Sequence, residues 1–210
     1  MVFEMMKADS GSNDPDAVLS PLSLIERNLP GSGVDLYIGD SRAASDPELL
    51  AGNNIVMVLN CAVNLDINLV VEADPKATVL PYGPGFVRYY KLGIIDGPGN
   101  PAPMLLAGYY QLAGLLQQRF PDRATYPRRE SGNILVNCRG GRSRSVALAA
   151  LYLHLEWAER YPTLESAIEH VRTARGLSPK TRYKRPKPVL LESAYWAADM
   201  VKIIAPHIPD

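Results

Sequence analysis

One short stretch of the sequence, residues 133–145 (NILVNCRGGRSRS), joins a cysteine to a segment rich in glycine and arginine. An apolar run of strand length leads to Cys138, a six-residue loop with two glycines follows, and a helix is predicted to begin near Arg144. The backbone N–H groups of such a loop can converge on one point, and the positive end of the helix dipole adds to their field. Such an environment lowers the pKa of a thiol from about 8.5 to roughly 3.5–7.5. The stretch therefore predicts a nucleophilic thiolate inside a cradle for an oxyanion.

The arginine that closes this stretch fits the same chemistry. The planar fork of Arg144 can hold two oxygens of a tetrahedral oxyanion at once, which a lysine ammonium cannot do. The spacing Cys-x5-Arg alone is a weak signal, but Gly141 inside it and Ser145 after it make the pattern much more specific. The alternative is a small buried cysteine in a glycine turn with arginines on the surface.

The surrounding sequence predicts elements that would position this loop. Strands are predicted at 34–38, 55–59, 86–95 and 134–136, and helices at 47–51, 104–120, 146–160, 163–175 and 189–204. Strands alternating with helices are typical of the α/β class, so we expect a central, mostly parallel sheet of about four to five strands flanked by helices. We expect residues 1–30 to be a partly disordered N-terminal lead-in and residues 31–210 to form the domain. The sequence of residues 64–84 predicts neither a helix nor a strand clearly.

Composition excludes several other classes. The 210 residues suit one domain, and 22 basic against 22 acidic residues indicate no nucleic-acid partner. Two cysteines and three histidines exclude a disulfide scaffold and argue against a structural zinc site. No apolar stretch has the roughly 20 residues that span a bilayer, and the first residues lack the basic start of a signal peptide. We expect a cytoplasmic protein with no transmembrane segment.

Residues 138–145 (CRGGRSRS) resemble the Cys-x2-Gly-x2-Arg-Ser/Thr signature of the dual-specificity branch of the cysteine-dependent protein tyrosine phosphatases. Segments similar to other parts of that family are 35–39 (its opening strand), 58–60 (its second strand), 90–96 (the strand before its general-acid loop) and 163–175 (its penultimate helix). The resemblance runs from Val34 to the last predicted helix. Residues 64–86 and 122–132 look like insertions into that family's minimal domain.

The resemblance implies a role for each matching residue. Cys138 would attack phosphorus to form a phosphocysteine, and Asp96 would protonate the leaving oxygen and then activate water. Ser145 would donate a hydrogen bond to the departing thiolate. No metal or organic cofactor is implied, and a phosphate or sulfate ion is expected at the loop. The residues implied in phosphate binding are Arg139, Gly140, Gly141, Arg142, Ser143 and Arg144.

Two of these assignments leave alternatives open. Asp96 could be a plain turn aspartate before Gly97, and Asp66 and Asp74 are rival acids, although neither follows a comparable strand. The family normally has histidine before the cysteine, whereas this chain has Asn137. We expect Asn137 to leave a higher thiol pKa and slower turnover.

The resemblance implies a phosphomonoester hydrolase of the EC 3.1.3 type, with protein tyrosine or dual-specificity substrates as the first hypothesis. Arg139 and Arg142 favour a second, a phosphoinositide, inositol phosphate or phospholipid head group, because a polyanion offers further phosphates to pair. The basic segment 171–188 would lie beside the site, or it is a solvated face. From another class, Asn137 favours a catalytically weak phosphate-binding module.

The second cysteine suggests a redox hypothesis. Arg139 and Arg142 resemble the basic residues at the same two loop positions of a phosphoinositide phosphatase of that family, in which a cysteine placed like Cys61 can form a disulfide with the nucleophile. We therefore expect a reversible Cys61–Cys138 bond under oxidation. The alternative is that Cys61 is a small buried hydrophobe.

Overall fold

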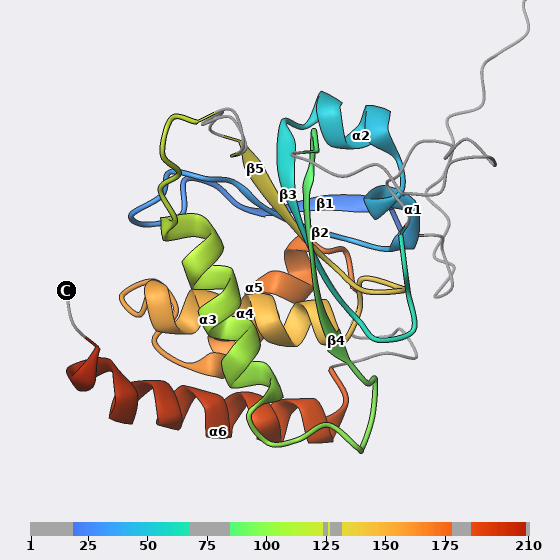
Figure 1. Ribbon diagram of the computed structural model, residues 1–210. Coiled ribbons are helices and arrows are strands. Elements are labelled where there is room, and N and C mark those ends of the chain that lie inside the picture. Colours follow the sequence, from blue (N-terminus) through green and yellow to red (C-terminus); the bar gives the residue numbers. More distant parts are fainter. Residues whose placement is uncertain (1–18, 68–84, 124–125, 127–131, 178–185, 209–210) are drawn as a thin grey trace, which may run out of the picture.

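The computed structural model describes residues 19–67, 85–123, 126, 132–177 and 186–208 (Figure 1). Residues 1–18 of the expected lead-in and most of the two expected insertions lie outside the described residues. No helix within these ranges is long and apolar enough to cross a lipid bilayer.

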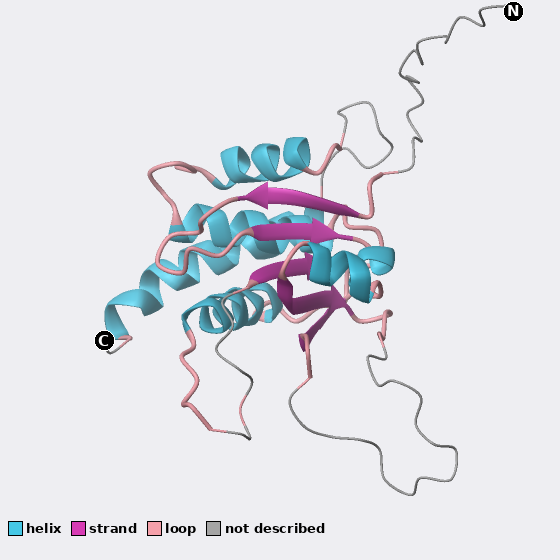
Figure 2. Cartoon of the chain, turned by 90° about the horizontal axis from the view of Figure 1, so that it is seen from above, coloured by secondary structure: helices cyan, strands magenta, loops and turns pink. Residues whose placement is uncertain are grey.

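Within these ranges, five strands form one sheet in the order β1-β2-β5-β3-β4. Their bounds are Leu22–Glu26 (β1), Leu36–Gly39 (β2), Ile55–Ala62 (β3), Arg88–Ile94 (β4) and Asn133–Asn137 (β5). The strands β2, β5, β3 and β4 run parallel, whereas β1 pairs antiparallel with β2 (Figure 2). The expected central, mostly parallel sheet is confirmed. Strand β1 was not predicted, and it lies within the segment 1–30 that we expected to be a lead-in.

Helices cover both faces of the sheet. Their bounds are Ser41–Ala44 (α1), Pro47–Gly52 (α2), Met104–Gln117 (α3), Arg144–Glu156 (α4), Leu164–Ala174 (α5) and Pro188–Ile204 (α6), followed by a 3-10 turn at Ala205–His207. Helices α3 to α6 pack on one face, and the short α1 and α2 on the other (Figure 1). Helix α2 begins as predicted, because the Asp46 carboxylate accepts hydrogen bonds from the backbone N–H groups of Glu48 and Leu49.

Alternation along the strands builds two apolar cores. In β2, Leu36 and Ile38 face the large core under α3 to α6, while Tyr37 joins the small core under α1 and α2. In β5, Leu135 likewise faces the small core. Strands buried on both faces are typical of parallel sheets between helical layers. The carboxyl ends of β2, β5, β3 and β4 therefore meet at one edge, where parallel α/β sheets carry their sites.

Candidate active site

Cys138 stands at this edge, directly after the central strand β5. Its side chain is 2% exposed, and its Sγ lies 3.3 Å from the Oγ of Ser145 in the first turn of α4. We call residues 138–143, between β5 and α4, the cysteine loop. The structure thus has the order strand, loop and helix that the sequence predicted for residues 133–145.

The outward carbonyls of the cysteine loop show how its backbone is oriented. The carbonyl oxygens of Arg139, Gly141 and Ser143 accept hydrogen bonds from groups outside the loop, respectively the N–H of Ser41 (3.2 Å), the Nε of Arg175 (3.2 Å) and the N–H of Ala147 (2.8 Å). In a trans peptide, C=O and N–H point in opposite directions. The N–H groups that follow these three carbonyls, those of residues 140, 142 and 144, therefore point away from the supports. Alternate peptides with inward N–H groups form an anion-binding nest.

The pKa of Cys138 is lowered in this environment. Burial acts against ionisation, but hydrogen bonds from the Ser145 hydroxyl, the Ser145 N–H and the Arg142 N–H outweigh it, and the charge of Arg144 adds to them. The N–H of Arg142 is one of those turned inward by the outward carbonyls. The surroundings of Cys138 therefore favour ionisation of its thiol relative to a free cysteine.

Arg144 lies almost fully buried, 4% exposed, with its guanidinium fixed from two sides. Its Nη1 donates to the Oδ1 of Asn64 (3.0 Å) and to the carbonyl of Ile94 (3.2 Å). Its Nε donates to no partner among the described residues. Asn64 was not recognised from the sequence. Its position just beyond the carboxyl end of β3 is the signal that could have singled it out.

Asp96 follows β4 at the same edge, within residues 95–100, which we call the acid loop. The side chain of Asn100 closes this loop, with Oδ1 accepting from the N–H of Ile95 (2.8 Å) and Nδ2 donating to the carbonyls of Ile95 (2.8 Å) and Gly97 (3.2 Å). The Oδ1 of Asp96 is buried and accepts no hydrogen bond from the described part of the chain. The rival Asp66 has an 85% exposed side chain that pairs with Lys91, and Asp74 lies outside the described residues.

Lys187, just before α6, touches both loops. Its backbone N–H donates to the Oγ of Ser143 (3.3 Å), and its ammonium donates to the carbonyl of Asp96 (2.5 Å) and lies 4.0 Å from the Asp96 Oδ2. The basic segment 171–188 thus does reach the site through Lys187. Arg172 and Arg175, from the same segment, are buried and do not form part of a solvated face.

The other basic residues of the cysteine loop are more accessible. Arg139 is exposed and Arg142 is half-buried. The sequence predicted that Arg139 and Arg142 lie beside Cys138. It did not predict the direction in which either side chain points. Both add positive charge around the nest formed by the loop backbone.

Asn137 and Cys61 lie on neighbouring strands. Asn137 is fully buried, and its side-chain amide forms no hydrogen bond with the described residues. It pairs in register with Asn60 of β3, so that Cys61 and Cys138 come next on adjacent strands, in the same core. Burial raises the pKa of the Cys61 thiol, and Cys138 raises it further. Both cysteines are free in this structure.

The fold is of the α/β class, with a mostly parallel sheet and a cysteine loop at its carboxyl edge. Solved structures with the same fold identify which α/β fold it is. The structure of human DUSP28 is 20% identical, with a TM-score of 0.54 over 87% of this chain and 96% of that one. The structure of a mouse putative dual specificity phosphatase complexed with zinc tungstate is 20% identical, with a TM-score of 0.55 over 96% of this chain and 97% of that one. The chain therefore has the dual-specificity phosphatase fold.

Sequence comparison finds a likeness to part of a longer protein. No family model matches the chain. The protein-tyrosine-phosphatase MKP1 of Arabidopsis thaliana is 27% identical over 143 residues, which are 68% of this chain and 15% of that protein. The chain thus corresponds to only a small part of this relative.

Proposed function

We propose that this chain is a phosphomonoester hydrolase that acts through the thiolate of Cys138, with protein phosphotyrosine or dual-specificity substrates as the first candidates. The observation that carries the proposal is the backbone of the cysteine loop. Three carbonyls held outward turn the intervening N–H groups toward the place where the oxygens of a phosphoryl group would lie, around a thiol whose pKa is lowered. A module that only binds phosphate has no need of such a nucleophile.

In the first step, the Cys138 thiolate attacks phosphorus and the bond between phosphorus and the ester oxygen breaks. The Nε of Arg144 and the loop N–H groups hold the phosphoryl oxygens as their charge shifts. The carboxylic acid of Asp96 gives its proton to the leaving oxygen, so the departing alcohol is neutral. The products of this step are the free alcohol, a phosphocysteine and the Asp96 carboxylate.

In the second step, water attacks the phosphocysteine. Asp96 accepts a proton from that water, the bond between phosphorus and Sγ breaks, and inorganic phosphate leaves. The Ser145 hydroxyl, 3.3 Å from Sγ, donates a hydrogen bond to the departing thiolate. Both the acid and the thiolate are regenerated, so the cycle is closed without a co-reactant.

The test is hydrolysis of a small aryl phosphate between pH 5 and 8 in the presence of reductant. Cys138→Ser should lose at least ~10³-fold in kcat, because a serine hydroxyl is not ionised in this pH range. Cys61→Ser is the matched control, since it removes the other cysteine of the chain from the same core. Activity that survives Cys138→Ser would exclude the proposal. If neither the wild type nor Cys138→Ser hydrolyses the ester, but both bind vanadate or tungstate, the chain is a phosphate-binding module.

A polyphosphorylated substrate is the second candidate. It is supported by the accessible cations around the cysteine loop, Arg139, Arg142 and Lys187, which could pair with phosphates beyond the one that is cleaved. A panel of phosphopeptides, inositol phosphates and phosphoinositides would be compared for the wild type and for Arg139→Ala/Arg142→Ala. Loss confined to the multiply phosphorylated substrates supports this candidate. An unchanged order of preference rules it out.

A further inference from the structure

Arg175 is the feature that the proposed mechanism leaves unused. It follows α5, lies outside the cysteine loop, and is 2% exposed, which places it among the largest fully buried side chains of the described residues. Burial of a guanidinium is unfavourable unless its donors are satisfied, and two of the three nitrogens of Arg175 are, while its Nη2 has no partner among the described residues. Its Nε donates to the carbonyl of Gly141 (3.2 Å), and its Nη1 donates to the carbonyl of Ser20 (2.6 Å) and to the Oγ of Ser23 (2.8 Å).

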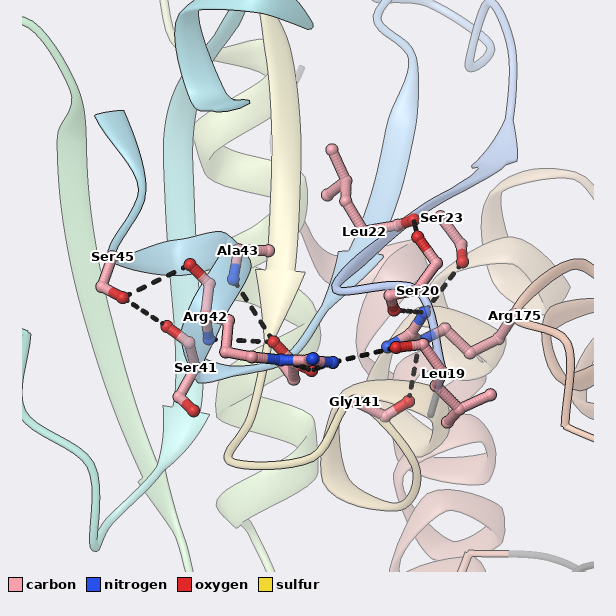
Figure 3. A network of polar contacts seen from close by, with 11 residues as sticks. Leu19, Ser20, Leu22, Ser23, Ser41, Arg42, Ala43, Ser45, Gly141 and Arg175 are labelled. Atoms are coloured by element: carbon pink, nitrogen blue, oxygen red, sulfur yellow. Dashed lines mark hydrogen bonds and ion pairs between the residues drawn. The ribbon is translucent and has the colours of Figure 1, made fainter. Parts of the chain in front are cut away.

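These contacts fix one particular peptide of the cysteine loop. Figure 3 shows Arg175 between Gly141 and the serines Ser20 and Ser23 at β1. The peptide whose carbonyl it holds carries the N–H of Arg142, and that N–H is one of the donors that lower the pKa of Cys138. The guanidinium, the peptide and the sulfur therefore form one chain of hydrogen bonds, in which each bond polarises the next.

Gly141 shows why this peptide needs a support. Its φ is +62°, a left-handed conformation that side chains rarely adopt, and a Cβ there would lie 2.8 Å from the carbonyl oxygen of Gly39. The same Cβ would lie 3.0 Å from the Nη2 of Arg175, so the end of β2 and this guanidinium both lie close against Gly141. Without Arg175 the Gly141 carbonyl would lose the hydrogen bond that holds it outward, and the peptide could turn over.

The charge of Arg175 acts in the same direction. The acceptors of its hydrogen bonds from Nε and Nη1 are neutral groups, and the Asp40 carboxylate on its side of the loop is hydrogen bonded to Arg42 instead. Burial lowers the pKa of Arg175, whereas Asp40 and Cys138 raise it. An interaction between two charges stabilises both, so the guanidinium also stabilises the thiolate. The other ionisable groups near Cys138 are Cys61 from β3 and Arg144 from α4, and those near Arg175 are Asp40, Arg42 and Arg142.

We propose that Arg175 is a positioning residue of the site, which holds the Gly141–Arg142 peptide so that the Arg142 N–H faces the Cys138 sulfur. The proposal deepens the proposed function, on which its kinetic consequences rest. The state of the thiol can also be measured with no substrate at all, so the two proposals can fail separately.

The test measures the rate of alkylation of Cys138 by iodoacetamide from pH 4 to 10, in a Cys61→Ser background, beside kcat and KM for an aryl phosphate. Arg175→Met should move the alkylation midpoint to higher pH and lower kcat by about 10²-fold, the size expected for a misplaced site group. Arg175→Lys keeps a charge but loses the fork, so it should recover part of the midpoint and little of kcat. The matched control is Arg172→Met, which removes a buried guanidinium of α5 that forms an ion pair with Glu169.

Each outcome decides the proposal. If Arg175→Lys has the same alkylation midpoint and the same kcat as the wild type, the charge at this position is sufficient. The proposed positioning role is then wrong. Equal shifts in Arg172→Met and Arg175→Met mean that loss of any buried guanidinium perturbs the site, and this too overturns it. If Arg175→Met does not fold, Ser23→Ala removes one of the bonds that hold Arg175 (2.8 Å) and should move the midpoint in the same direction by a smaller amount. An unmoved midpoint in both Ser23→Ala and Arg175→Lys would exclude the proposal.

Discussion

The cysteine loop and the acid loop meet at one edge of the sheet but are held in different ways. The cysteine loop is held by the buried guanidinium of Arg175 and by the backbone N–H of the half-buried Ser41 at the start of α1. The acid loop is held by the amide of Asn100 and by Lys187, whose side chain is 51% exposed. Water competes with exposed polar contacts and competes far less with buried ones. The proposed nucleophile is therefore preorganised by a buried contact, whereas the proposed acid is held by contacts that water can reach.

The largest difference between the loops should appear with Asp96→Asn. It keeps the shape of the side chain but has no proton to give, so kcat for a substrate with a poor leaving group should fall by about 10²–10⁴-fold. The loss should be much smaller for an aryl phosphate with a good leaving group, and the alkylation midpoint of Cys138 should not move. Asp66→Asn, which changes the exposed rival carboxylate, is the control. Equal losses for both leaving groups would show that Asp96 is not the acid.

The cysteine loop should respond to Gly141→Ala. An alanine must adopt φ near +62° and place its Cβ 2.8 Å from the Gly39 carbonyl oxygen, so the loop must shift and kcat should fall by about 10²-fold. Unlike Asp96→Asn, this change should raise the pH at which Cys138 is alkylated. Gly140→Ala, where the nearest atom to a Cβ would be 3.8 Å away, should have a much smaller effect on both measurements. Similar effects of the two alanines would contradict the tight fit of Gly141.

A smaller effect is expected from Asn100→Ala, which opens the acid loop without touching its carboxylate. The loop loses all three side-chain hydrogen bonds of Asn100, and kcat should fall by about 10-fold because Asp96 is less well placed. The thiol titration should stay as in the wild type. Asn53→Ala, which removes an asparagine bonded to the carbonyl of Leu49 in α2, is the control for loss of an amide elsewhere. A moved thiol titration would mean that the two loops are coupled more tightly than their contacts indicate.

The smallest effect on basal activity belongs to Cys61→Ser, which tests the redox hypothesis. Peroxide oxidises the Cys138 thiolate to a sulfenic acid, and attack by Cys61 then releases water and forms a disulfide. Adjacent strands lie about 4.8 Å apart, which suits the Cα separation of a disulfide. Without Cys61, excess peroxide can oxidise the sulfenic acid further to a sulfinic acid, which a thiol reductant does not reverse. Wild-type activity should therefore return with reductant, while less of the activity of Cys61→Ser should return. Mass spectra of oxidised wild type with Cys138 only as sulfenic or sulfinic acid would exclude the bond.

Much of the frame was predictable because local signals and tertiary packing agree. Asp46 and Thr163 cap helices where the sequence places their starts, and β5, the cysteine loop and α4 follow one another as expected. Strand β1 was not predictable. It is a short edge strand beside a polar, proline-containing segment, and its pairing with β2 decides its structure more than its own pattern does.

The partners of the site residues were also beyond the sequence. Asn64 lies 80 positions from Arg144, and Arg175 lies 34 positions from Gly141, so only the sheet and helix packing bring them together. Counting charge placed Arg175 in a basic run, but charge alone does not distinguish a solvated arginine from a buried one. Arg175 is buried because α5 packs beside β1, and this packing cannot be read from the charge pattern.

The bond between Arg175 and Ser20 also has a consequence for how the chain folds. It joins residues 155 positions apart, and contacts so distant in sequence form slowly because a long loop must close first. Cys138 is synthesised well before Arg175, so the growing chain carries an ordinary thiol at that position. The proposed role of Arg175 therefore implies that the Cys138 thiol gains its reactivity only after residues 20 and 175 have come together in the folded chain.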